Sequence, residues 1–162
     1  MAQSGDIFGG KDYDKTIIQR GVVLRGDISS TEDIDIWGNL IGNMKVAGDA
    51  RVGGKIRGDI TADRVGIYSG AVQGNIISER EIVLDEESVV VGNLTCSEDI
   101  TVYGKVKGDV TATGKATLQS AAQMIGDVTA RLISLNEGAR VRGKVTMASN
   151  SPDIEFDLDI KL

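Results

Sequence analysis

Histidine is absent from the 162 residues of this chain, and cysteine and proline occur once each. Without histidine, the common Ser-His and Cys-His nucleophilic pairs and the usual zinc ligand are excluded. The single cysteine, Cys96, cannot form an internal disulfide, and no apolar leader precedes the repeats described below. We therefore expect a protein of the reducing cytoplasm. No stretch approaches the roughly 20 apolar residues that a membrane-spanning helix needs.

Aromatic residues make up only 4% of the chain, and its 18 Lys and Arg are outnumbered by 24 Asp and Glu. With so few aromatic rings, the core has to be built from Ile, Val, Leu and small residues. The net charge of −6 argues against a nucleic-acid partner, because there is no surplus of cations to displace counterions from phosphates. Hydrophobic residues still amount to 41% and alternate regularly, which is not the composition of a disordered chain.

Glycine, in contrast, is abundant at 21 residues, and some of these glycines open a repeat. Each such marker glycine precedes a polar residue that is followed by an aliphatic one. The markers are Gly26, Gly42, Gly58, Gly74, Gly92, Gly108, Gly126 and Gly143. They are 16 to 18 residues apart. A helical hairpin or a propeller blade needs about 33 to 50 residues, so this period predicts one coil of a β-helix.

Apolar and polar residues alternate within each repeat, which predicts short strands. Counted from the marker glycine, the inward positions are the third, fifth, ninth, eleventh and fifteenth, with a slip of one residue in the repeat that starts at Gly58. The repeats after Gly74 and Gly108 carry two extra residues just before the next glycine, where we expect a corner loop. In these two repeats we expect Val91 and Ile125 to point inward.

One repeat system covers most of the chain and predicts a single β-helix domain over residues 16–150. A flexible polar tail, 1–15, precedes it. Pro152 ends it, because proline cannot donate to a strand ladder. Residues 151–162 form a tail in which acidic and hydrophobic residues alternate. Two placements of this tail remain open: a strand over the open end of the core, with Phe156 and Leu158 as the plug, or an interaction tail.

Equal positions in neighbouring coils stack about 4.8 Å apart, so each position forms a column along the rod. The residue after each marker glycine gives the column Asp27, Asn43, Asp59, Asn75, Asn93, Asp109, Asp127 and Lys144. We expect a polar ladder here, in which side-chain amides donate to neighbouring carboxylates, rather than a set of metal ligands.

Charge is sorted by position within the repeat. Acidic residues gather before the ninth position: Glu32, Asp33, Asp49, Glu79, Glu81, Glu98 and Asp99. Basic residues flank the fifteenth: Lys55, Arg57, Lys105, Lys107, Arg140 and Arg142. This sorting would let rods attract one another side by side in a salt-dependent way, and an ordinary solvated surface is the simpler alternative.

No catalytic residue, cofactor site or metal site is predicted. Cys96 occupies the fifth position, which other repeats fill with Ser or Ala, so we expect a small inward core residue. Carboxylates are plentiful, but they lie on exposed ladders and nothing predicts a cleft. We therefore expect a protein that is not an enzyme.

Three fragments have the pattern of a known family: VKGDVTA (Val106 to Ala112), IRGDITADRVGI (Ile56 to Ile67) and LNEGARVRGKV (Leu135 to Val145). Over residues 20 to 148 the repeats resemble those of bactofilins, polymer-forming cytoskeletal proteins of bacteria. The resemblance implies an all-β fold, a right-handed three-sided parallel β-helix, which agrees with the handedness of parallel crossovers. It also implies nucleotide-independent, end-to-end assembly into filaments that scaffold cell-shape, envelope or organelle functions, often at the inner face of the cytoplasmic membrane.

The open ends of a β-helix expose unpaired strand edges and stacked aliphatic side chains, so two ends can continue one ladder. The expected partner is therefore another copy of this chain, and envelope-associated proteins are further candidates. Membrane contact is left open, because the N-terminal stretch is polar. The predicted polymerisation interface consists of Ile17, Ile18, Val22 and Leu24 at one end and Val145, Met147, Phe156 and Leu158 at the other.

Two other kinds of β-helix protein share part of this pattern. Hexapeptide-repeat acyltransferases need an aliphatic residue at every sixth position, and although Ile28 and Ile34 comply, the register fails at Gly58. Their catalytic histidine is also missing. A monomeric or capped β-helix binding module stays open as an alternative, because the sequence separates it poorly from a filament subunit.

Overall fold

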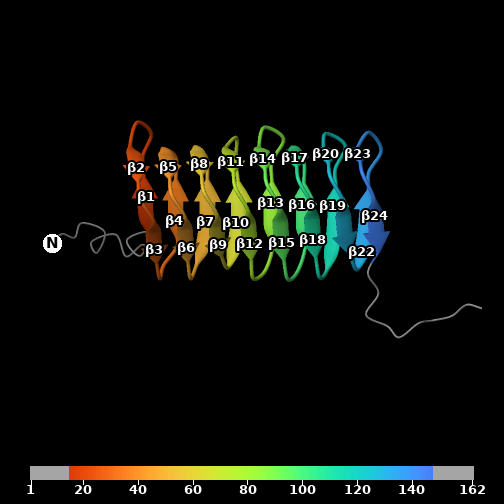
Figure 1. Ribbon diagram of the computed structural model, residues 1–162, viewed down its shortest axis with the longest axis horizontal. Helices are drawn as coiled ribbons and strands as arrows, with labels where there is room; N and C mark the ends of the chain where they lie inside the picture. Colours follow the sequence, from red (N-terminus) through yellow and green to blue (C-terminus); the bar gives the residue numbers. More distant parts are fainter. Residues whose placement is uncertain (1–14, 148–162) are drawn as a thin grey trace, which may run out of the picture.

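The computed structural model describes residues 15–147, which form a rod of 24 short parallel β-strands without any helix. The chain winds around the rod axis and adds one strand to each of three sheets in every coil. Figure 1 shows these coils stacked in chain order, with the first strands at one end and the last at the other. Each sheet has eight strands, so the rod has eight coils.

The three sheets are named A, B and C in the order in which the chain visits them. Sheet A contains β1 (Thr16–Ile18), β4 (Ile34–Ile36), β7 (Asp49–Val52), β10 (Arg64–Ile67), β13 (Ile82–Leu84), β16 (Ile100–Val102), β19 (Lys115–Leu118) and β22 (Leu132–Leu135). Sheet B contains β2 (Val23–Arg25), β5 (Asn39–Ile41), β8 (Lys55–Arg57), β11 (Ala71–Gln73), β14 (Val89–Val91), β17 (Lys105–Lys107), β20 (Gln123–Ile125) and β23 (Arg140–Arg142). Sheet C contains β3 (Ile28–Ser30), β6 (Met44–Val46), β9 (Ile60–Ala62), β12 (Ile76–Ser78), β15 (Leu94–Cys96), β18 (Val110–Ala112), β21 (Val128–Ala130) and β24 (Val145–Met147).

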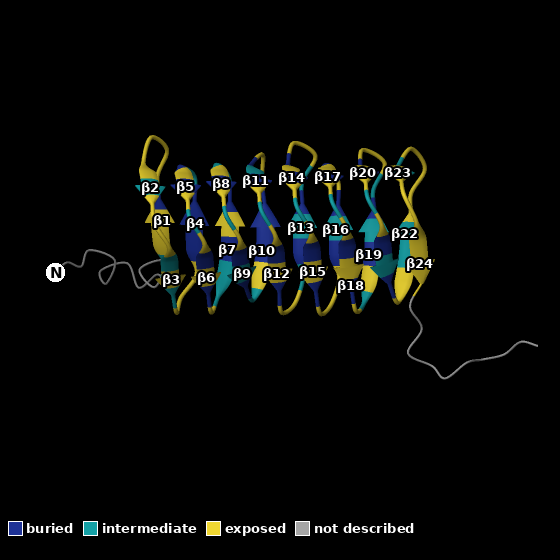
Figure 2. Ribbon diagram, viewed as in Figure 1, coloured by how far each residue is buried: buried dark blue, intermediate teal, exposed yellow. Residues whose placement is uncertain are grey.

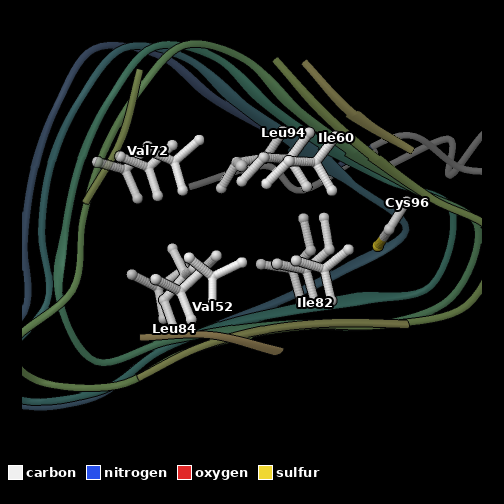
Figure 3. Close-up of a cluster of buried hydrophobic side chains, with 14 of the residues drawn as sticks. Val52, Ile60, Val72, Ile82, Leu84, Leu94 and Cys96 are labelled. Atoms are coloured by element: carbon white, nitrogen blue, oxygen red, sulfur yellow. The ribbon is translucent and has the colours of Figure 1, made fainter. Parts of the chain in front are cut away.

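The core is a narrow column of aliphatic side chains enclosed by the three sheets. In Figure 3, Val52 and Leu84 from sheet A, Val72 from sheet B and Leu94 from sheet C point toward one another across this column. Each of them is buried. The predicted three-sided parallel β-helix and its aliphatic core are confirmed.

The inward positions follow the predicted pattern, including the slip in one repeat. Val65 pairs with Ala50 and Ile67 with Val52, so the chain has one residue fewer at the corner before β10, and it regains that residue at the corner 68–70 before β11. The side chains of all four residues are buried. A one-residue change at a corner therefore leaves the faces of the strands unchanged, because the pairing and not the residue count sets the register.

The prediction that Val91 and Ile125 point inward is wrong. Both are exposed, whereas Val90 and Met124 are buried in their place. The extra residues form the four-residue corners 85–88 and 119–122, which precede β14 and β20 instead of following them. The inward position of these strands therefore lies two residues before the next marker glycine in every coil.

The marker glycines make the tight corner between sheets B and C. Gly42 has a φ of +147°, a conformation that residues with a side chain rarely adopt. A Cβ atom at Gly42 would also collide with the carbonyl oxygen of Gly26 in the preceding coil. The corner is therefore closed to any other residue, both by the backbone conformation and by the close approach of the neighbouring coil.

Candidate functional site

The two ends of the rod are the places where the regular structure stops without a partner strand among the described residues. The N-terminal edge consists of β1, β2 and β3, and the C-terminal edge consists of β22, β23 and β24. Each of these six strands pairs on one side only. Their outward backbone N–H and C=O groups are therefore available to extend all three sheets.

At the C-terminal end, side chains that belong to the core columns are uncovered. Met147 pairs with Ala130, and Val145 pairs with Val128. The two residues of the inner coil are fully buried, whereas Met147 is 60% exposed and Val145 is 43% exposed. Leu135 shows the same difference between the last two coils, because it pairs with the buried Leu118 but is itself exposed. Figure 2 shows this change from buried strands in the middle of the rod to the exposed β24.

At the N-terminal end, the core columns are covered more completely. Ile18 pairs with Ile36 and is still buried, and Leu24 pairs with Leu40 and is partly buried. Val22 is exposed and lies in the corner before β2. Its carbonyl accepts the N–H of Asn39, as the carbonyls of residues at this corner position do in later coils.

The structure brings most of the predicted interface residues to the two ends but separates Ile17 from the others. Ile17 pairs with Asp35, so it lies on the outer side of sheet A and not in a core column. Phe156 and Leu158 lie outside the described residues. The C-terminal end of the core is also reached by Leu135, Ile133 and Val141, which were not among the predicted interface residues. Counting back from Gly143 would have placed Val141 there.

A charged contact lies next to the N-terminal edge. The Nζ atom of Lys15 is 3.3 Å from Oδ2 of Asp35, and the Asp35 side chain is largely buried. Asp35 lies on β4, the strand that pairs with the edge strand β1. This ion pair sits beside the predicted interface residues Ile17 and Ile18, on the outer side of the sheet.

The predicted polar ladder is present, but its donors are different from those expected. The Oδ1 atom of each Asp or Asn accepts the backbone N–H of the corresponding residue in the next coil, at 2.9 to 3.0 Å. The series runs from Asp27 to the N–H of Lys144 without a gap. Because the acceptor is an oxygen that Asp and Asn share, either residue serves. Lys144 ends the series, since its side chain has no acceptor.

Charge is distributed around the rod as the sequence predicted. The acidic positions lie in or next to the corners between sheets C and A, and the basic positions lie on the outer side of sheet B. At the acidic corner, the N–H of Asp49 donates to Oδ1 of Asp33 at 2.9 Å. Burial raises the pKa of Asp49 above its ordinary value, and the carboxylate of Asp33 raises it further.

The interior offers no reactive group. Cys96 is buried in the column of small residues, as predicted, and burial raises the pKa of its thiol to about 11. Over residues 15–147, no group of three or more His, Cys, Asp or Glu side chains is placed to hold a metal ion. The same residues contain no helix that could cross a membrane.

Comparison with known families decides the identity of these repeats. A family model for bactofilins, described as polymer-forming cytoskeletal proteins, matches residues 16–97 and again residues 55–146. The chain belongs to the bactofilin family. The two matches overlap and together follow the β-helix from β1 into β24. A search of curated proteins and a search of solved structures found no match for this bactofilin.

Proposed function

We propose that this bactofilin assembles end to end, without nucleotide, into filaments that serve as a scaffold for cell shape, the envelope or an organelle. The observation that supports it most is the set of core-column side chains left uncovered at the C-terminal end, Val145 and Met147 among them. The role is structural rather than enzymatic, and the main partner is another copy of the chain. We place it in the cytoplasm, including the inner face of the cytoplasmic membrane, with envelope-associated proteins as further partners.

The strand edges support assembly without a nucleotide. A second rod that continues the three sheets repeats the contacts that already join neighbouring coils, with three further strand pairs and a continued core. Full burial of an aliphatic side chain contributes about 1.5–3 kcal/mol. Several such side chains per joint, together with the strand hydrogen bonds, provide the free energy of association from the protein alone.

Electron microscopy of the purified protein, without nucleotide or metal, tests the proposal. We expect long thin filaments at both low and high salt, because the joint is formed by apolar burial and backbone hydrogen bonds. Single short rods at every protein concentration would contradict it and favour the alternative, a capped binding module. Deleting residues 151–162 would then show whether that segment prevents assembly.

A pair of variants of β24 tests the joint itself. Met147→Asp places a carboxylate in the core column at the end of the rod, and we expect it to remove filaments. Thr146→Asp is the matched control, because Thr146 lies between the two core positions and on the outer side of the same strand. Filaments that persist in Met147→Asp would exclude this end from the joint, and far-UV circular dichroism checks that both variants keep the β-structure.

A further inference from the structure

The outer side of sheet B carries positive charge and exposed aliphatic residues but no carboxylate on its strands. The side chains form two columns, one from the first and one from the third residue of each strand. The first column is Val23, Asn39, Lys55, Ala71, Val89, Lys105, Gln123 and Arg140. The third is Arg25, Ile41, Arg57, Gln73, Val91, Lys107, Ile125 and Arg142. Basic and apolar residues thus follow one another along the rod.

A groove runs between these two columns. Over β14, β17, β20 and β23 it has a volume of about 600 Å³, and over β8, β11 and β14 a volume of about 420 Å³. Val89 and Val91 line both parts, so the two parts are continuous. The middle residue of each strand, such as Val106, turns its side chain into the core and leaves backbone as the floor. We call this feature, over β8 to β23, the sheet B groove.

We propose that residues 153–162 of the same chain bind in the sheet B groove. This segment carries four carboxylates, on Asp153, Glu155, Asp157 and Asp159, and they alternate with Ile154, Phe156, Leu158 and Ile160. An extended chain with this alternation presents apolar groups on one side and carboxylates on the other. Its composition complements a groove that has exposed Val and Ile side chains and rims of Lys and Arg.

The length of the segment suits the groove. The described chain ends at Met147 in β24, which follows β23 in the same coil. Residues 148–152 span at most about 17 Å when extended, about the length of β24 with the corner that joins it to β23, so residue 153 can reach the edge of sheet B without covering the end of the rod. The next ten residues span about 33 Å when extended, and the six strands of the groove, about 4.8 Å apart, span about 24 Å, so the segment is long enough to fill the groove.

A spin label on the segment tests this placement in the full chain. Lys161→Cys introduces a reactive thiol without removing a carboxylate, and the buried Cys96, whose thiol pKa is raised to about 11, does not compete for the label. We expect an immobilised spectral component at low salt that is lost at high salt, because the contacts are partly ionic. A label that is mobile at low salt would overturn the proposal, whether or not the protein then binds anionic lipid vesicles instead.

Charge reversal separates the groove from other surfaces. Lys105→Glu with Lys107→Glu reverses both rims of the groove and is expected to remove the immobilised component. Arg51→Glu with Lys115→Glu makes the same change of net charge on the outer side of sheet A. This pair is expected to leave the immobilised component unchanged. Equal effects of the two pairs would contradict a specific site. Asp157→Lys with Asp159→Lys should restore immobilisation to the groove variant.

Two further measurements exclude other positions of the segment. In the first, the labelled groove variant is mixed with an excess of unlabelled wild type, and the label should stay mobile. A label that became immobilised on mixing would show that the segment binds to a neighbouring copy. The sequence placed Phe156 in the polymerisation interface, and the proposal places it in the groove instead. Phe156→Arg should therefore release the label while filaments persist in the electron microscope. Loss of filaments in that variant would place the segment at the rod ends and overturn the proposal. The inference does not depend on end-to-end assembly, because the label reports on the groove and microscopy on the joint.

Discussion

Interior and terminal coils of the rod are built from the same repeat, yet their core positions are not equally covered. Val128 and Val145 occupy one column, and the first is fully buried whereas the second is 43% exposed. The difference arises because an interior coil has a neighbour on both sides and a terminal coil on one. The same residue therefore stabilises the fold in the interior, while at the C-terminal end part of its apolar surface is available for association.

The largest contrast is expected from a carboxylate placed in each kind of coil. Ile60→Asp puts an unpaired charge into the middle of a dry core and costs several kcal/mol, so we expect the rod to unfold. Val145→Asp makes the same change where water reaches the side chain, and a small change in melting temperature is expected. Thermal melts by circular dichroism measure both, and an Ile60→Asp melt like that of the wild type would contradict the interior position.

A smaller contrast is expected from two marker glycines. Gly58 and Gly26 both have positive φ, +145° and +129°. A Cβ atom at Gly58 would collide with the carbonyl oxygen of Gly42, whereas one at Gly26 meets nothing within 4 Å. Gly26→Ala should therefore cost only the backbone strain, about 1–3 kcal/mol. Gly58→Ala should cost more than that. Urea unfolding measures the free energy of unfolding of the two variants. Equal losses of this free energy would show that the close approach of the neighbouring coil adds nothing to the cost.

The smallest effect on stability at neutral pH is expected at Cys96. Cys96 lies in the interior of the small-residue column that ends at Met147. The folded chain holds the thiol of Cys96 protonated up to about pH 11, against 9.0 for the ordinary thiol. Unfolding thus releases a proton above pH 9, so the contribution of this group to stability is present below pH 9 and is lost as the pH rises toward 11. Cys96→Ala should remove that part of the decline in denaturant titrations.

Thiol labelling sharpens the same comparison without any change in stability. A Met147→Cys variant should react quickly with a thiol reagent at pH 8, and Cys96 should react only after unfolding. Assembly should slow the reaction at position 147 if the joint covers this end. Equal reactivity of the two thiols would contradict the difference between interior and terminal coils.

Much of the fold could be predicted from local patterns. The marker glycines and the period-two alternation placed the strands, and Cys96 was recognised as a core residue from its position in the repeat. Val91 and Ile125 were misplaced because counting forward from a glycine carries the corner insertion into the strand that follows it. The donors of the polar ladder were missed for another reason. A sequence shows which side chains are stacked but not that a backbone N–H comes within 2.9 Å of them.

The sequence by itself determined the coil, because turn geometry and alternation act between residues close together in the chain. Only the tertiary structure decided how residues far apart are combined. Lys55 and Arg142 lie on one face because the coils stack in register, and this stacking creates the sheet B groove. It also decided that Met147 is exposed while Ala130 in the same column is buried. Burial depends on whether another coil lies on top, and no local pattern contains that information.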